Sequence, residues 1–166
     1  MILRPFSPAD ADSVNSAALA AFDQYRGVFS DWEKLERGVG AMASLAGTAE
    51  ILVAEEGGEI VGAVAYCAQF SEPRADFFKP EWAIVRLLVV RPEARGLGVG
   101  RALTEACMER ARRDGAPLVA LHTSPAMEVA LAMYLRMGFT LLRSVPDRFG
   151  VPYGVYTMRP APPPAS

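Results

Sequence analysis

Three glycines between two arginines form the segment of this chain that is best suited to bind a phosphate group. The segment reads Arg95-Gly96-Leu97-Gly98-Val99-Gly100-Arg101. Backbone N–H groups at the start of a helix are unpaired and lie at the positive end of the helix dipole, so they bind anions well. Alternate glycines let a phosphate approach the backbone, and the arginines can add charge-assisted hydrogen bonds. The segment therefore predicts a pyrophosphate-binding loop.

Two common nucleotide-binding loops do not fit this spacing. A Walker loop needs four residues between its glycines and then Gly-Lys-Ser/Thr, but three residues separate Gly96 from Gly100, and Arg101-Ala102 follows. A dinucleotide fingerprint needs Gly-x-Gly-x-x-Gly, and its third glycine would fall on Arg101. The region 116–121 also lacks an acidic residue that could bind a ribose. A nucleotide-dependent oxidoreductase is therefore disfavoured.

The glycine loop instead resembles the coenzyme A loop of the GCN5-related N-acetyltransferase (GNAT) superfamily, Arg/Gln-x-x-Gly-x-Gly/Ala. Residues 95–100 match that pattern at every defined position, and Leu88-Val89-Val90-Arg91-Pro92 before them resembles the family's fourth strand. The segment Ala130-Leu131-Ala132-Met133-Tyr134-Leu135-Arg136-Met137-Gly138-Phe139 is similar to the family's Ala-x-x-x-Tyr-x-x-x-Gly-Phe motif. The two motifs occur in the family's order and, with their surroundings, cover most of the chain.

This resemblance implies an α+β (α/β) fold with a mixed, mostly antiparallel sheet of six to seven strands flanked by about four helices. The fourth and fifth strands of such a sheet splay apart. It also implies an acetyl-CoA-dependent N-acetyltransferase, with acetyl-CoA as co-substrate and no metal. A primary amine, in a small molecule or a peptide, would attack the thioester directly, and a homodimer is compatible with the family. The alternative is a non-catalytic acyl-CoA-binding sensor.

The resemblance also implies roles for two titratable side chains. Tyr134 matches the tyrosine near the coenzyme sulfur and would protonate the leaving thiolate, since a phenol pKa of about 10 is close to a thiol pKa of about 8.5. His122, the single histidine, lies where some relatives keep a glutamate and could accept the proton of the amine. Glu81 or a water molecule is the alternative base.

The remaining site residues concern the coenzyme arm and the acceptor. The strand residues Leu88, Val89 and Val90 would contribute backbone donors to the pantetheine arm and to the tetrahedral oxygen. Met127 replaces an asparagine that many relatives use for this arm, so a coenzyme contact there is in doubt. Aromatic residues are expected to frame a mainly apolar acceptor pocket, and Phe29 and Tyr153 are expected to contact the substrate. The full set of these pocket aromatics is Phe22, Tyr25, Phe29, Trp32, Phe149 and Tyr153.

Composition narrows the class of protein further. The 166 residues are 51% hydrophobic, which suits a single domain, predicted over 1–159 and followed by a disordered proline-rich tail over 160–166. A net charge of −2 without a basic stripe disfavours nucleic acid. Cys67 and Cys107 form no C-x-x-C pair, which argues against a disulfide framework and a zinc site. Without a signal-peptide pattern or a bilayer span, we expect a cytoplasmic protein with no membrane contact.

Periodicity and turn signals place these residues on elements. The pattern predicts, in order, a strand at 2–6, helices from Ser7 to 25 and at 31–45, a hairpin of 50–55 and 60–70, a buried central strand at 82–90, a helix at 99–114, a strand at 118–122, a helix from Ser124 to 137, and strands at 139–145 and 153–158 around a turn at 146–152. The glycine loop thus joins a buried strand to a helix.

Overall fold

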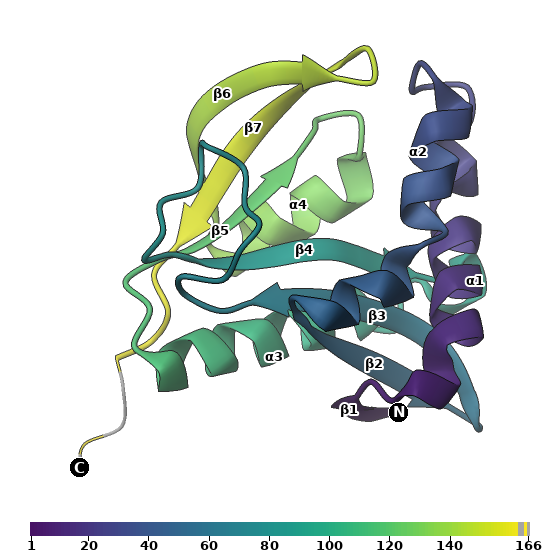
Figure 1. Cartoon of the computed structure of the whole chain (residues 1–166), viewed down its shortest axis with the longest axis horizontal. Coiled ribbons are helices and arrows are strands. Elements are labelled where there is room, and N and C mark those ends of the chain that lie inside the picture. The colour runs from purple at the N-terminus through teal and green to yellow at the C-terminus, as the bar shows by residue number, and fades with distance from the viewer. Residues whose placement is uncertain (163–164, 166) are drawn as a thin grey trace.

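A seven-stranded sheet forms the centre of the computed structural model, which describes residues 1–162 and 165 (Figure 1). The strands lie in the order β1-β2-β3-β4-β5-β7-β6, and every neighbouring pair is antiparallel except β4 and β5. They are β1 (Ile2–Pro5), β2 (Glu50–Glu56), β3 (Glu59–Cys67), β4 (Ala83–Val90), β5 (Val119–Thr123), β6 (Thr140–Arg148) and β7 (Val151–Met158). The predicted mixed, mostly antiparallel sheet is confirmed.

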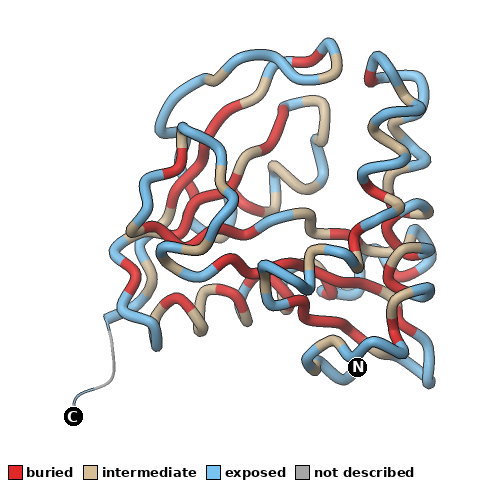
Figure 2. The backbone as a smooth tube through the Cα atoms, in the orientation of Figure 1, coloured by how far each residue is buried: buried red, intermediate tan, exposed pale blue. Residues whose placement is uncertain are grey.

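Four α-helices cover the two faces of this sheet within the described residues. They are α1 (Ala11–Phe22), α2 (Trp32–Val39), α3 (Val99–Asp114) and α4 (Glu128–Met137). Successive residues of a strand point to opposite faces of the sheet, so β2 contributes side chains to the hydrophobic core on each face. Leu52 packs with α3 and α4, whereas its neighbours Ile51 and Val53 pack with α1 and α2. Figure 2 shows the buried residues concentrated in the inner strands, while β6 is exposed along nearly all of its length.

The sheet opens between its two central strands. β4 pairs with β5 at Ala83↔Val119 and Ile84↔Ala120, after which the described residues of the two strands separate (Figure 1). Four of the next residues, Val85, Arg86, Val89 and Val90, keep their partners on β3, but none of residues 85–90 has a partner on β5. The predicted splay is thus present, and it leaves backbone hydrogen-bonding groups of β4 facing a gap.

Local sequence signals explain how the chain enters the first helix. Ser7 and Asp10 form a capping box, in which the Ser7 backbone N–H donates to the Asp10 carboxylate at 2.8 Å. Arg4 of β1 donates to the same carboxylate at 2.8 and 2.9 Å. The Arg4 hydrogen bonds lower the pKa of Asp10 to about 2, despite its burial. This ion pair fixes α1 against the edge of the sheet.

Five predicted boundaries need correction. α1 covers Ala11–Phe22 rather than Ser7 to 25, because separate 3-10 segments, Pro8–Asp10 and Asp23–Tyr25, flank it. α2 ends at Val39 rather than near 45, because Gly40 caps it and a separate 3-10 segment, Met42–Gly47, follows. α4 begins at Glu128 rather than directly after Ser124, whose hydroxyl accepts the Ala126 N–H and closes a preceding turn. β3 ends at Cys67 rather than at 70. The strands β6 and β7 meet at a tight turn at 149–150 instead of the broad turn predicted over 146–152.

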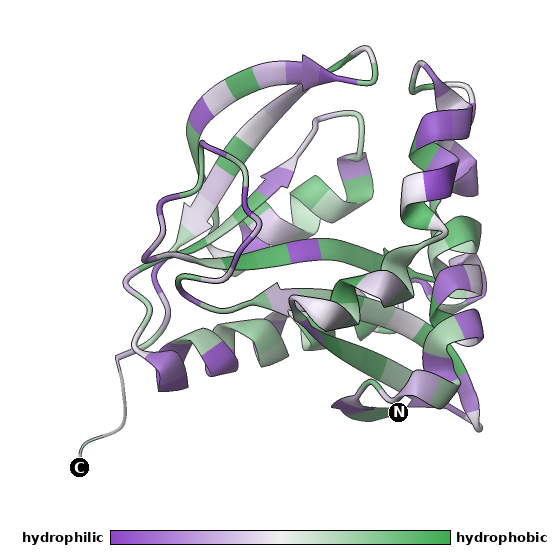
Figure 3. Ribbon diagram, in the orientation of Figure 1, coloured by the Kyte–Doolittle hydropathy of each residue, from purple (hydrophilic) through white to green (hydrophobic). Residues whose placement is uncertain are grey.

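Hydropathy follows the burial of the elements. The central strands are mainly hydrophobic in Figure 3, but one hydrophilic band interrupts β4, whose sequence Ala-Ile-Val-Arg-Leu-Leu-Val-Val contains a single charged residue, Arg86. No helix in the described part of the chain has the length and apolar character needed to cross a membrane. The predicted tail over 160–166 lies partly outside the described residues, and both this tail and the single domain over 1–159 stay predictions.

Candidate active site

The glycine loop leads directly into α3, as its pattern predicts. Gly96 and Gly98 both adopt positive φ angles of 79°, a conformation that other residues adopt only with strain. Gly98 is the N-cap of α3, and its carbonyl accepts the Ala102 N–H at 3.0 Å. A Cβ atom placed on Gly96 or Gly98 would meet no atom within 4 Å. These glycines are therefore required by backbone conformation, and the space beside them is open to a ligand.

The two arginines of the loop are engaged with protein partners. Arg95 donates to the Ala21 carbonyl at the end of α1, with a distance of 3.2 Å. Arg101 lies one turn from Glu105 on α3 and forms an exposed ion pair with it at 2.8 Å. Both residues are nevertheless exposed, so their contact with an anion stays a prediction beside that of the backbone N–H groups at the start of α3.

An irregularity in β4 shapes the wall of the gap. Leu87 has a φ angle of 53°, and the pairing of β3 with β4 shifts register beside it, between Ala63 and Ala65. This β-bulge lets the strand turn its next residues, so that Leu88 lines the gap while Val89 packs on the α1 side of the sheet. No glycine or asparagine marks the position, so sequence patterns did not reveal it.

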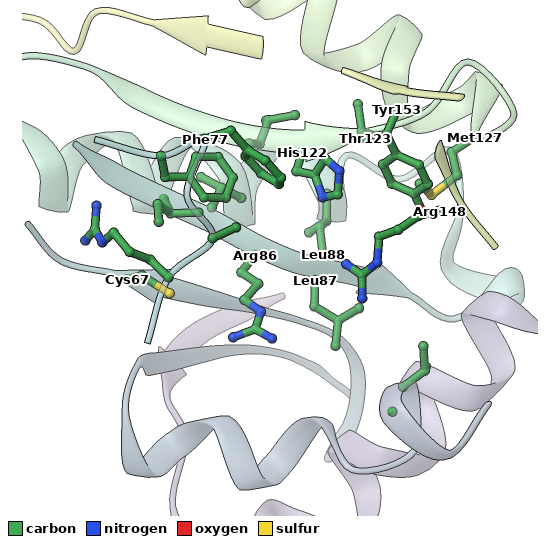
Figure 4. A pocket seen from close by; sticks show the side chains of 18 of the residues that line it. Cys67, Phe77, Arg86, Leu87, Leu88, His122, Thr123, Met127, Arg148 and Tyr153 are labelled. Atoms are coloured by element: carbon green, nitrogen blue, oxygen red, sulfur yellow. The ribbon is translucent and has the colours of Figure 1, made fainter. Parts of the chain in front are cut away.

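A cavity of about 510 Å³ occupies the gap between the two halves of the sheet. Its walls come from α2, β4, β5, α4, the loop before β4 and the β6–β7 turn (Figure 4). Of the predicted site residues, Leu88, His122, Tyr134 and Tyr153 line it, as does Met127. Phe29 and Glu81 are not among the lining residues; Phe29 is buried and packs edge-on against Tyr25 at 5.5 Å.

Tyr134 reaches the cavity from α4 and is 5% exposed. Its ring packs edge-on against Phe139, with centroids 5.6 Å apart, so the two aromatic residues of the second motif pack against each other. Burial raises the pKa of the phenol well above its usual value. Tyr134 is therefore protonated throughout the neutral range, as a proton donor must be, but the raised pKa makes it a weaker acid than an ordinary phenol.

His122 lies on β5 between aromatic rings. The His122 centroid is 4.3 Å from that of Tyr153 and 4.8 Å from that of Phe77. Burial, followed by the charge of Arg148, lowers the pKa of His122 to about 4, and its Nε2 atom is buried without a hydrogen-bond partner among the described residues. The imidazole is thus neutral at pH 7 and has a vacant ring nitrogen, but it is a weak base.

The cavity also contains groups that motif analysis missed. Cys67 lines it, and burial raises the pKa of its thiol. Four basic residues line it as well: Lys34, Arg74, Arg86 and Arg148. They come from segments far apart in the chain, so only the charge inside the apolar strand 82–90 gave a local signal. No group of three His, Cys, Asp or Glu side chains in the described residues is placed to hold a metal ion.

Solved structures share this architecture over nearly the whole chain. A Corynebacterium glutamicum structure, described as histone acetyltransferase HPA2 and related acetyltransferase, has a TM-score of 0.73 and 24% identity over 98% of both chains. An acetyltransferase from Salmonella typhimurium, solved with its cofactor acetyl-CoA, has a TM-score of 0.69 and 19% identity, covering 100% of this chain and 97% of its own. At these identities the likeness concerns the fold.

Sequence comparison points the same way. A mycothiol acetyltransferase of Sanguibacter keddieii is 35% identical over 89 residues, which are 54% of this chain and 27% of that protein. The match thus spans only about a quarter of the relative's own length. A model of the acetyltransferase (GNAT) family matches residues 15–139, three quarters of the chain and both of its motifs. On this match, the chain belongs to the acetyltransferase (GNAT) family.

Proposed function

We propose that this protein transfers the acetyl group of acetyl-CoA to a primary amine. The observation that carries the proposal is the gap between β4 and β5. A cavity that contains Tyr134 lies there, and its lining residue Leu88 would be 3.6 Å from a Cβ atom on Gly100, at the start of the helix that follows the open glycine loop. A ligand with a pyrophosphate at one end and a thin, amide-bearing arm at the other fits this combination. Coenzyme A has that chemistry, and the Salmonella structure contains its acetyl ester.

The residues present fit such a co-substrate. Backbone N–H groups of residues 98–101 would bind the pyrophosphate, and the unpaired edge of β4 around residues 88–90 would bind the amides of the arm. Because β5 has moved away, those groups of β4 are available for hydrogen bonds that a continuous sheet would use itself. When bound, acetyl-CoA supplies a thioester carbon that an amine can attack.

The proton transfers in this proposal use the chain's own side chains. The amine nitrogen forms a bond to the acetyl carbon, and the bond from that carbon to sulfur breaks. Tyr134 gives its proton to the departing thiolate, and the amine gives one proton to His122 or to water. Water is the favoured acceptor, because the Nε2 atom of His122 is buried and the pKa of the ring is low.

Thermal unfolding with matched concentrations of acetyl-CoA, CoA, NAD and ATP tests the co-substrate. A ligand present at 100 times its dissociation constant stabilises the folded state by about 2.7 kcal/mol, which moves the midpoint measurably. We expect stabilisation by acetyl-CoA and CoA but not by NAD. Absence of a shift with acetyl-CoA would withdraw the proposed function.

Thiol release with a broad amine panel then separates an enzyme from a sensor. Acetyl-CoA-dependent thiol release in the presence of an amine supports the transferase. Tight coenzyme binding without release for any amine would support the non-catalytic acyl-CoA-binding module instead. The panel includes free amino compounds and peptides with free N-termini, because both classes of acceptor follow from the proposal, and it includes longer acyl-CoA donors.

Two further properties belong to the proposal. A homodimer is supported by β6, an edge strand with exposed Leu141 and Leu142, because such an edge can pair with a second copy. Sedimentation or light scattering gives the number of subunits directly.

A cytoplasmic location is supported by Cys67 and Cys107, which are buried free thiols. Neither nucleic acid nor a membrane is an expected partner.

A further inference from the structure

We propose that the acceptor is a small amine that also carries an acidic group, either a carboxylate or a phosphate. This inference rests on the proposed function and narrows its acceptor class. It follows from the charges around the cavity, which come from α2, β4, the loop before β4 and the β6–β7 hairpin. An amino acid or a phosphorylated amino alcohol has the required chemistry.

All charged residues that line the cavity within the described part of the chain are basic. They are Lys34, Arg74, Arg86 and Arg148, and no aspartate or glutamate accompanies them. The whole chain contains more acidic than basic residues, with 19 against 17. A random sample of its charged residues would therefore include carboxylates, so the cavity is selectively basic.

Three of the four basic groups are available to a ligand. Arg74 donates to the backbone carbonyls of Ala68, Ser71, Lys79 and Trp82, so its role is to hold the loop before β4. The hydrogen bonds and ion pairs of the described residues involve neither Lys34 nor Arg86 nor Arg148. Arg148 only lies beside the ring of the adjacent Phe149, with Cζ 5.5 Å from the centroid.

Arg86 and Arg148 line the cavity from two different strands, β4 and β6. Arg86 is the one charge in the otherwise apolar β4, and Arg148 is the last residue of β6. Figure 4 shows both side chains around the cavity that His122 and Tyr153 also face. The fork of a guanidinium group binds carboxylates and phosphates through two parallel hydrogen bonds. Two such groups without protein partners mark the place of an anion.

The same charges favour attack by a neutral amine. A positive surrounding disfavours an ammonium ion relative to the free amine and so lowers the pKa of a bound acceptor. Its effect is already visible on His122, because the Arg148 charge contributes to the low pKa of that ring. The acidic group of the acceptor would anchor it, while the basic cavity would help its amine to lose a proton. A strong protein base is then unnecessary.

The size and lining of the cavity describe the rest of the acceptor. About 510 Å³ must hold both the end of the coenzyme arm and the acceptor, which suits a small molecule. The rings of Phe77, His122 and Tyr153, tilted against one another, provide a largely apolar wall for its body. Polycationic acceptors such as aminoglycosides and polyamines are excluded by the lack of carboxylates at the described cavity walls.

Matched acceptor pairs test the acidic group. Thiol release is measured for glycine, leucine, methionine and phenylalanine, each against its carboxamide, and for O-phosphoethanolamine against ethanolamine. We expect kcat/KM to favour the acidic member by about tenfold or more in at least one pair. Comparison of the amino acid pairs with the phosphoethanolamine pair shows whether the acidic group of the acceptor is a carboxylate or a phosphate. Equal rates within every pair that reacts would overturn the inference.

Charge-removing variants locate the preference. In Arg86→Gln and Arg148→Gln, the ratio of kcat/KM for the acid to that for its amide should fall by about tenfold, mainly through KM. Arg37→Gln on α2 and Arg136→Gln on α4 are matched controls, because both arginines are exposed and lie outside the cavity. A preference unchanged in both cavity variants would contradict the proposed site.

A binding measurement keeps this inference separate from catalysis. Isothermal titration of the CoA-loaded protein compares the N-acetyl derivatives of the same acids and amides, together with N-acetylphosphoethanolamine. Tighter binding of the anionic derivatives, lost in Arg148→Gln, supports the acidic acceptor even if no amine is turned over. If an uncharged amine is acetylated but no anionic derivative binds more tightly, the transferase stands and the acidic acceptor is wrong.

Discussion

The ring of His122 lies against the ring of Tyr153, with centroids 4.3 Å apart and planes inclined by 39°. These residues come from the neighbouring strands β5 and β7, and the contact covers one face of the imidazole. Burial of this kind disfavours the charged ring, and Arg148 adds a like charge, which together lower the pKa of His122 to about 4. Several expected results depend on this neutral histidine.

If His122 takes part in amine deprotonation, its influence on the rate should change near pH 4 and not near pH 6.5. The ratio of kcat/KM for wild type to that for His122→Gln should be constant between about pH 5.5 and 8, because the ring stays neutral throughout that range. It should decrease only as pH approaches 4. A ratio that changes around pH 6.5 would show that the ring is not desolvated.

The same ring should make stability depend on pH. Its folded pKa lies below the unfolded value of about 6.5, so the unfolded chain binds more protons between pH 6.5 and about 4. The free energy of unfolding should therefore decrease as pH falls through that window, and His122→Phe should reduce the slope. Urea unfolding at several pH values measures it. The Asp10 carboxylate, with a pKa of about 2, acts at lower pH.

Tyr134→Phe should lower kcat by about 10² or more while leaving the dissociation constant of acetyl-CoA nearly unchanged. The variant removes the hydroxyl but keeps the ring that packs against Phe139. Single-turnover rates and coenzyme titration measure the two quantities separately. An unchanged rate at saturating substrates would remove Tyr134 from the chemistry, and a control, Tyr156→Phe on β7 outside the cavity, should leave kcat close to wild type.

Gly100→Glu should abolish coenzyme binding, because it places a carboxylate beside the proposed pyrophosphate site. Gly100→Ala is the matched control. Its added Cβ would meet Met133 Sδ at 3.4 Å and Leu88 Cδ2 at 3.6 Å, which are tolerable contacts, so the fold and most of the affinity should persist. Titration of both variants with CoA measures the difference. Normal affinity in Gly100→Glu would contradict the loop assignment.

Gly62→Ala should destabilise the protein by about 1 to 3 kcal/mol through overpacking. A Cβ at Gly62 would lie 2.9 Å from Val99 Cγ1 and 3.0 Å from the Val89 carbonyl, where β3 touches the start of α3. By contrast, Gly38→Ala within α2 meets nothing within 4 Å and should stabilise by up to about 1 kcal/mol. Urea unfolding shows whether each variant raises or lowers the free energy of unfolding. Equal effects in the two variants would show that the close approach of β3 to α3 at Gly62 does not matter for stability.

Sequence patterns predicted the elements best where local and tertiary signals agree. The helix at 99–114 has an apolar face, a preceding glycine loop and Gly115 at its end, and its bounds are confirmed. The prediction was wrong where a residue type, proline, occurs both in turns and in strands. Pro146 and Pro152 fit the predicted turn, but both lie inside strands. Pro146 lies in the exposed edge strand β6, and Pro152 is the exposed second residue of β7.

In the candidate site, too, local motifs were predicted from the sequence, whereas contacts between distant segments were not. The glycine loop and Tyr134 are local motifs; the structure places the loop at the start of α3 and Tyr134 at the cavity. The directions of Arg95 and Arg101 depend on Ala21 and Glu105, which no loop pattern contains. The basic cavity was also invisible, because Lys34, Arg86 and Arg148 meet only after the chain folds.

The two walls of the cavity come from different parts of the chain, and this affects how the protein can change over evolutionary time. The coenzyme wall consists of β4 and the loop entering α3, whose geometry depends on the sheet and the core. Lys34 and Arg148, in contrast, lie on the surface helix α2 and at the tip of a hairpin. Substitutions there leave the core packing intact. Acceptor choice can therefore diverge through a few surface mutations while the donor site stays under constraint.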